Sequence, residues 1–156
     1  EQNKETLLEN LDTIYQRARN ISNENKEINT GKNYLEQLKY MINAYSSDTI
    51  NVILNTSTLH EVPLNSEVKI ALYRVLQELM VNMKKHSNCS LVMIGFKETN
   101  SALEINYSDN GKGTDNQLQI KNGLQNVENR IFSINGNITF DTEPNKGFKV
   151  KITIPK

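Results

Sequence analysis

Polar side chains suited to phosphate and metal chemistry recur at helical spacing within residues 73–87. At about 100° per residue, Glu78, Asn82 and His86 share one stripe of a helix, and Lys85 joins it one turn beyond Asn82. The stripe follows the border of an apolar face that includes Leu79. A carboxylate, an amide, an amine and an imidazole are therefore held at the rim of a buried surface. The pattern fits either a functional site or a polar helix edge in contact with solvent.

A second polar feature is Asp109, at the end of an alternating strand. Leu103, Ile105 and Tyr107 point to one face of this strand, and Asp109 has the same parity. Its carboxylate is then directed inward, where an acid needs a bonded partner. The glycines at positions 111 and 113 break the strand and let the backbone approach a flat ring closely. A glycine-rich turn without a ligand is the alternative.

A third feature is the start of a helix predicted for residues 123–134, with Asn122 as its cap. The unpaired N–H groups at Gly123 are suited to phosphate oxygens. An Asn side-chain oxygen, such as that of Asn82, is a hard ligand suited to Mg²⁺. Together the three features predict a site for a purine at one end and a metal-bound triphosphate at the other. The sequence has neither a GxxxxGK[ST] phosphate loop nor the protein-kinase motif set.

The elements that must position these residues follow from periodicity. Helices are predicted for residues 4–24, 34–44, 66–87 and 123–134, and strands for residues 50–55, 91–96, 102–108, 137–142 and 147–154. This order predicts an α+β fold, a two-layer sandwich in which a mixed sheet carries helices on one face. Residues 25–33 are polar and aperiodic, so they are predicted to link the amphipathic first helix to a domain of residues 34–156.

The first helix has apolar residues at a 4, 3, 4, 3 spacing, which is typical of helices that pack side by side. The seam consists of Leu7, Leu11, Ile14, Ala18 and Ile21. One interpretation is half of a helical hairpin that forms a homodimer, and the other is a helix that lies on the sheet of its own domain. We favour the hairpin, because the next 40 residues supply no obvious partner helix.

Composition excludes several function classes. The 156 residues carry 18 basic and 18 acidic side chains, so no general attraction to nucleic acid or to an acidic membrane surface is expected. Cys89 is the only cysteine, which excludes an internal disulfide and favours a reducing, cytoplasmic location. No apolar run reaches the ~20 residues of a spanning helix, so no membrane contact is predicted within this chain. The start at Glu1 rather than Met indicates a piece of a longer protein, and a membrane anchor elsewhere in that protein is compatible with this prediction.

In order along the chain, these motifs resemble the N box, G1 box, G2 box and closing strand of the ATP-binding domain of sensor histidine kinases. The resemblance covers residues 34–156, and its motif residues are Glu78, Asn82, Lys85 and His86, then Asp109, Gly111 and Gly113, then Gly123 and Leu124, then Gly147 to Pro155. The likeness is greatest to the subgroup with a short ATP lid, of the nitrate-sensor and lipid-fluidity-sensor type. Residues 1–24 then resemble the second helix of that subgroup's dimerisation and phosphoacceptor hairpin, with the first helix absent.

The resemblance implies a role for each motif residue. Asp109 would bind the adenine amine, with Gly111 and Gly113 closing over the ring. Asn82 would coordinate Mg²⁺, Lys85 and His86 would lie towards the phosphates, and Glu78 would orient metal-bound water or assist phosphoryl transfer. Gly123 and Leu124 would begin the helix behind the lid. The implied activity is transfer of the γ-phosphoryl of ATP to a histidine and from there to a response regulator.

Three departures from the family pattern bear on this activity. The G2 box has a single glycine, Gly123, where the family commonly has two, and Phe148 replaces a Thr that commonly joins the adenine network. Only His60 and His86 are present, and neither is on the helix of residues 4–24, so the chain alone is not expected to phosphorylate itself. The main alternative is a degenerate ATP-binding module that signals through dimer contacts. A kinase of the anti-sigma-factor class, with a serine acceptor, is disfavoured by the heptad helix.

Overall fold

The computed structural model describes residues 4–14, 28–59, 63–115 and 123–156. Residues 4–14 are helical, and the elements that follow are α2 (Tyr34–Asn43), β1 (Asn51–Asn55), α3 (Ser66–Asn82), a π-helix η1 (Met83–Ser87), β2 (Leu91–Glu98), β3 (Ala102–Asp109), α5 (Gln125–Ser133), β4 (Asn137–Thr142) and β5 (Phe148–Pro155). His60, one of the two histidines, lies outside the described residues.

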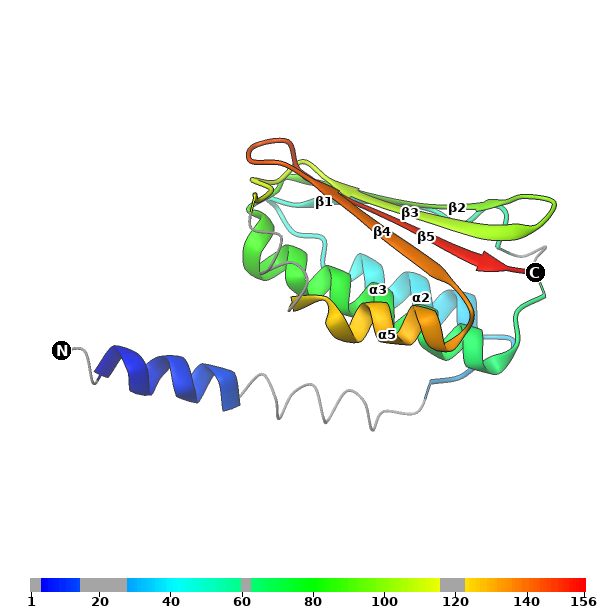
Figure 1. The fold of residues 1–156 in the computed structure, drawn as a ribbon, viewed down its shortest axis with the longest axis horizontal. Helices are drawn as coiled ribbons and strands as arrows, with labels where there is room; N and C mark the ends of the chain where they lie inside the picture. The colour runs from blue at the N-terminus through cyan, green and yellow to red at the C-terminus, as the bar shows by residue number, and fades with distance from the viewer. Residues whose placement is uncertain (1–3, 15–27, 60–62, 116–122) are drawn as a thin grey trace.

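The five strands form one mixed sheet in the order β1-β2-β3-β5-β4. β1 pairs with β2 in parallel, whereas β2–β3, β3–β5 and β4–β5 are antiparallel. In Figure 1, α2, α3 and α5 lie side by side on one face of this sheet, and no helix of the described residues covers the opposite face. The predicted α+β sandwich, with a mixed sheet covered on one side, is confirmed.

Helix α3 is the central helix of this layer and contacts both α2 and α5. Asn65 caps it, because its side-chain Oδ1 accepts a hydrogen bond of 2.9 Å from the backbone N–H of Val68. The helix thus begins at Ser66, the predicted start, and its cap is the residue before it. The helix buries one apolar face in the core, formed by Leu72, Val75, Leu76, Leu79 and Met80.

The sequence predicts one continuous helix over residues 66–87, but the structure divides this range into two kinds of helix. Regular α-helix ends at Asn82, and the next five residues form the π-helix η1. Asn88 then adopts a left-handed conformation with φ 50°, which stops the helix before β2. Short π-helical turns are rare and are frequent at functional sites. This turn changes which side chains share a face after Asn82.

The last helix also begins later than predicted. The sequence placed its start at Gly123, but α5 runs from Gln125 to Ser133, with Leu124 as its N-cap residue and no side-chain cap. The predicted cap, Asn122, lies outside the described residues. Val127 and Ile131 are fully buried, so α5 packs its predicted apolar stripe into the core.

The N-terminal helix exposes its apolar seam. Leu7, Leu11 and Ile14 are 54–62% exposed, so within residues 4–14 the seam is not packed on the sheet. The second half of the predicted helix, including Ala18 and Ile21, lies outside the described residues. Residues 28–33 are not helical, and Lys69 of α3 donates from Nζ to the backbone oxygen of Thr30 (2.7 Å).

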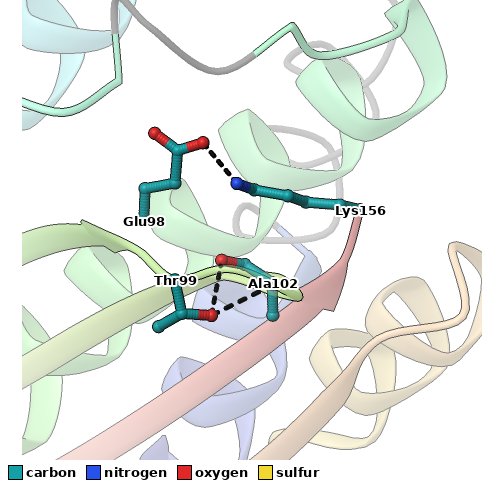
Figure 2. Close-up of polar contacts among 4 residues, drawn as sticks. All are labelled: Glu98, Thr99, Ala102 and Lys156. Carbon is teal, nitrogen blue, oxygen red and sulfur yellow. Dashed lines mark hydrogen bonds and ion pairs between the residues drawn. The ribbon is translucent and has the colours of Figure 1, made fainter.

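Polar contacts fix the C-terminus beside the β2–β3 turn (Figure 2). Lys156 forms an ion pair with Glu98, and its backbone N–H donates to the oxygen of Ser101 at 3.0 Å. Within the turn, the Thr99 hydroxyl bonds both the oxygen and the N–H of Ala102, each at 3.1 Å. The end of the chain is thereby held at the start of β3, opposite to the end that carries Asp109.

Candidate functional site

A cavity of about 310 Å³ opens where α3, η1, the end of β3 and the start of β5 meet. This volume is within the range of small-molecule sites. Its lining combines apolar walls with a few polar groups: Leu79, Asn82, Met83, His86, Ser87, Tyr107, Asp109, Lys112, Gly113, Thr114, Gly123, Leu124 and Phe148. Asn82 and Asp109, from different elements and 27 positions apart, therefore line one cavity.

Asp109 is the buried acid of this cavity. It is the last residue of β3, it is 8% exposed, and the strand geometry does persist to it, as the parity argument required. Its Oδ2 accepts a hydrogen bond of 2.7 Å from the Tyr107 hydroxyl, and its Oδ1 accepts one of 2.9 Å from the N–H of Gly111. The remaining lone pairs of the carboxylate can accept further hydrogen bonds from a ligand.

Tyr107 supports this carboxylate. Burial first, and then the charge of Asp109 and the hydrogen bond to it, raise the pKa of the phenol far above its ordinary value. The hydroxyl therefore stays protonated and acts as a donor throughout the physiological pH range. The ring packs edge-on against Phe148, which in turn stacks on Phe140 at 6.0 Å. An apolar wall of aromatic rings thus stands next to the acid.

The loop after β3 approaches η1 closely, and glycine makes this possible. A Cβ on Gly111 would lie 2.3 Å from the backbone oxygen of Ser87 and 1.9 Å from its Oγ. Gly113 has φ +58°, which disfavours any side chain, and a Cβ there would lie 2.0 Å from the oxygen of Glu143. The N–H of Lys112 donates to the Ser87 oxygen at 2.8 Å, which closes the loop onto η1.

Asn110 serves the loop rather than the cavity. Its Oδ1 accepts from the N–H groups of Ser90 and Leu91, each at 2.9 Å, and its Nδ2 bonds the Ser90 hydroxyl. The start of β2 is thereby tied to the turn that follows β3. These hydrogen bonds fix the residue that follows Asp109 to the start of β2.

The basic side chains of the cavity come from η1 and the loop. His86 and Lys112 both line it, and the pKa of His86 is lowered by partial burial, then by Lys85 and Lys112. The imidazole is therefore neutral at pH 7 in the unliganded protein. An anionic ligand placed here would reverse that shift, because a nearby negative charge favours the protonated imidazole.

The sequence of residues 67–156 matches the family described as "Histidine kinase-, DNA gyrase B-, and HSP90-like ATPase". The chain belongs to this ATPase family. The match covers more than half of the chain and includes every residue that lines the cavity.

Individual relatives narrow the type of ATPase domain. The chain is 35% identical over 91 residues to the signal transduction histidine-protein kinase/phosphatase DegS of Brevibacillus brevis, a match that covers 56% of this chain and 23% of the relative. It is 29% identical over 108 residues to the sensor histidine kinase ComP of Bacillus subtilis (strain 168), covering 67% of this chain and 14% of the relative. The chain thus spans less than a quarter of the length of these two relatives.

Among solved structures, the histidine kinase domain of the blue-light activated histidine kinase from Erythrobacter litoralis EL346 superposes with a TM-score of 0.66. That alignment covers 78% of this chain and 58% of the other at 16% identity, so it shows a shared fold. Together these matches identify residues 67–156 as an ATP-binding domain of the sensor histidine kinase type.

The structure separates the predicted site residues of this ATPase domain into two groups. Those that line the cavity are Asn82, His86, Asp109, Gly113, Gly123 and Leu124, and Gly111 borders it through Ser87 and Asp109. Glu78 and Lys85 are not among the lining residues; Glu78 is half-buried on α3 and Lys85 is exposed on η1.

Several lining residues were missed, and the π-helix explains one of them. At about 100° per residue, Ser87 would be about 140° away from Asn82 on an α-helix. A π-helix has i→i+5 hydrogen bonds and turns less per residue than an α-helix. Residues five apart therefore lie closer to one face, and Asn82 and Ser87 both line the cavity. Tyr107 was predicted to point inward but was not predicted to bond Asp109. Lys112 lies between the two glycines of the loop, and nothing in its sequence context marked it as a lining residue.

Proposed function

We propose that this chain is the ATP-binding catalytic part of a two-component sensor histidine kinase, transferring the γ-phosphoryl of ATP to a histidine outside residues 1–156. The proposal rests on one observation above all, that Asn82 and Asp109 line the same cavity. The relatives' names, sensor histidine kinase and signal transduction histidine-protein kinase/phosphatase, support it. From the histidine, the phosphoryl group is proposed to pass to a response regulator. A cytoplasmic location is proposed because the reaction uses ATP.

The base of the nucleotide is assigned to Asp109. An ionised carboxylate is an acceptor only, so it complements the 6-amino group of adenine. Phe148 and Tyr107 provide the flat apolar surface beside it. Gly111 and Gly113 keep the loop that borders the base close to Ser87 and to Glu143, because a Cβ at either glycine would clash there.

The phosphates are assigned to the basic side chains on η1 and the loop. His86 and Lys112 line the cavity, and Lys85 extends from the same turn and can reach a phosphate that projects towards solvent. Gly123 and Leu124 border the lid segment, and the N-terminus of α5 that follows supplies unpaired N–H groups.

The residues present fit a magnesium ion bound together with the phosphates. The amide oxygen of Asn82 is a hard ligand, and Mg²⁺ is usually held by one or two protein oxygens plus phosphates and water. In the described part of the chain, no group of three His, Cys, Asp or Glu side chains is placed to hold a metal without them. The ion supplies charge neutralisation at the transferring phosphoryl. Glu78, one turn before Asn82, would orient metal-bound water or assist transfer from the edge of the site.

We assign residues 1–24 to the second helix of a dimerisation hairpin and residues 25–33 to a linker. The exposed leucines of residues 4–14 support a partner helix, because an apolar seam of this kind is otherwise left in water. Assignment to the short-lid subgroup is supported by the short segment between the two motifs, since only residues 114–122 separate Gly113 from Gly123. Within the described ranges, no helix has the length and apolar character needed to cross a bilayer.

Calorimetric titration of the chain with ATP, with and without Mg²⁺, tests the proposal. We expect binding that is stronger with Mg²⁺, and in Asn82→Ala we expect the Mg²⁺ enhancement to disappear while binding of metal-free ATP remains. No binding at millimolar Mg-ATP would contradict the proposed function. If ATP binds, adding the parent protein's hairpin and detecting phosphohistidine separates a kinase from a module that binds ATP without catalysis.

A further inference from the structure

One buried hydroxyl in the cavity has no partner. Ser87 is 9% exposed and lines the cavity, and its Oγ is the single buried side-chain N or O atom without a hydrogen bond in the part of the chain that the structure describes. Buried polar groups are almost always hydrogen-bonded, and leaving one unpaired is unfavourable. A hydroxyl of this kind in a binding cavity is available to a ligand.

The Ser87 hydroxyl is adjacent to the carboxylate of Asp109. A Cβ built on Gly111 would lie 1.9 Å from Ser87 Oγ and 2.9 Å from Asp109 Oδ1, so both oxygens border the same point beside the glycine. The hydrogen bond from the N–H of Lys112 to the Ser87 backbone oxygen fixes this geometry. The π-helical turn is what brings Ser87 to this position.

Among the described residues near Asp109, Ser87 has a buried hydroxyl that does not yet donate a hydrogen bond. The Tyr107 hydroxyl and the Gly111 N–H both donate to the carboxylate. Phe148, which also lines the cavity, has no polar side-chain atom. The part of the cavity assigned to the base therefore has an acceptor, the carboxylate of Asp109, next to an O–H group that makes no hydrogen bond, that of Ser87.

This pair matches the edge of adenine. Adenine carries a donor, its 6-amino group, next to an acceptor, the ring nitrogen N1. Building on the function proposed above, we propose that Ser87 donates a hydrogen bond to N1 of adenine, directly or through one water, while Asp109 accepts from the 6-amino group. Ser87 is then a binding residue for the base, and it supplies the donor that the Phe148 side chain lacks.

A comparison of two nucleotides tests this assignment. The probes are Mg-ATP and Mg-1-deaza-ATP, in which a C–H replaces N1 and removes the acceptor. For Ser87→Ala we expect a three- to tenfold loss of ATP affinity, the usual effect of one hydrogen bond between neutral groups, and an unchanged affinity for 1-deaza-ATP. The melting temperature of the unliganded protein should not fall, because the removed hydroxyl has no partner in the described structure.

The matched control is Ser108→Ala. Ser108 precedes Asp109 on β3, but its side chain faces the side of the sheet away from the helices. The affinities of this variant for ATP and for 1-deaza-ATP should therefore equal those of the wild type. Equal ATP affinity for Ser87→Ala and the wild type would overturn the assignment, as would equal losses for the two nucleotides, which would indicate a structural effect. Failure of the wild type to bind Mg-ATP would instead remove the proposed function itself.

Discussion

Replacement of the buried acid by its amide, Asp109→Asn, is the most direct test of the base-binding geometry. The carboxylate already accepts from the Tyr107 hydroxyl at 2.7 Å and from the Gly111 N–H at 2.9 Å, and the proposed ligand adds the adenine amine. Three donors therefore converge on one acceptor-only group. An amide offers one oxygen and one NH₂, so it cannot accept from all three.

The expected loss of affinity follows from the groups involved. A hydrogen bond to a charged partner contributes about 1.5–3 kcal/mol, and a buried donor left facing another donor costs roughly 1–3 kcal/mol more. A combined loss of about 3 kcal/mol or more corresponds to at least a hundredfold weaker binding of ATP. In a titration of limited sensitivity, this is equivalent to the abolition of binding.

The fold should survive the same change. The amide oxygen of the variant can still accept from Gly111, and its NH₂ can donate to Tyr107, whose hydroxyl rotates to accept. Loss of about 1 kcal/mol of stability would lower the melting temperature of a chain this size by roughly 2–4 °C. Calorimetry with Mg-ATP and thermal melting by circular dichroism measure the two effects separately.

Asp141→Asn is the matched control for this experiment. Asp141 is exposed on β4 and does not line the cavity, so the variant should bind ATP as the wild type does. Wild-type affinity in Asp109→Asn itself would refute the assignment of this carboxylate to the adenine amine. A collapse of the melting temperature would show that Asp109 is needed mainly for folding.

Three further outcomes are expected. Tyr107→Phe should weaken ATP binding about three- to tenfold, through loss of the donor that orients the carboxylate, with little effect on metal dependence. Gly113→Ala should lower the melting temperature by several degrees, because φ is +58° and a Cβ would lie 2.0 Å from a backbone oxygen. Gly123→Ala should leave the melting temperature unchanged, because a Cβ there meets nothing within 4 Å. The pKa of His86, measured by NMR, should lie below its usual 6.5. Near that pH the unfolded chain then binds more protons than the folded protein, so the free energy of unfolding without nucleotide should fall as the pH drops through 6.5. Mg-ATP should raise the pKa of His86.

The sheet and its helices were predictable because their patterns are long and local. The alternation of β5 and the apolar stripe of α3 each extend over eight or more residues, which is enough to set the type of element and the buried face. The parity argument also placed Asp109 inward without knowledge of its partners. Ordered motifs then supplied what periodicity cannot, the identity of the family.

The details of the site were less predictable, since they depend on deviations from ideal geometry. The change from α- to π-helix after Asn82 has no simple signal in the sequence, and it moves Ser87 closer to the face that lines the cavity. The bond between Tyr107 and Asp109 joins two residues on one strand face, a neighbour relation that strand periodicity allows but does not require.

The anchored C-terminus has a practical consequence for biophysical work on this domain. Pro155 pairs with Ala102 at the beginning of β3, and Asp109 ends the same strand. The seven steps from Ala102 to Asp109, at about 3.4 Å each, put roughly 24 Å between the two ends. A fluorophore attached after Lys156 would therefore be remote enough to leave the cavity undisturbed, yet well within range for energy transfer to a labelled nucleotide.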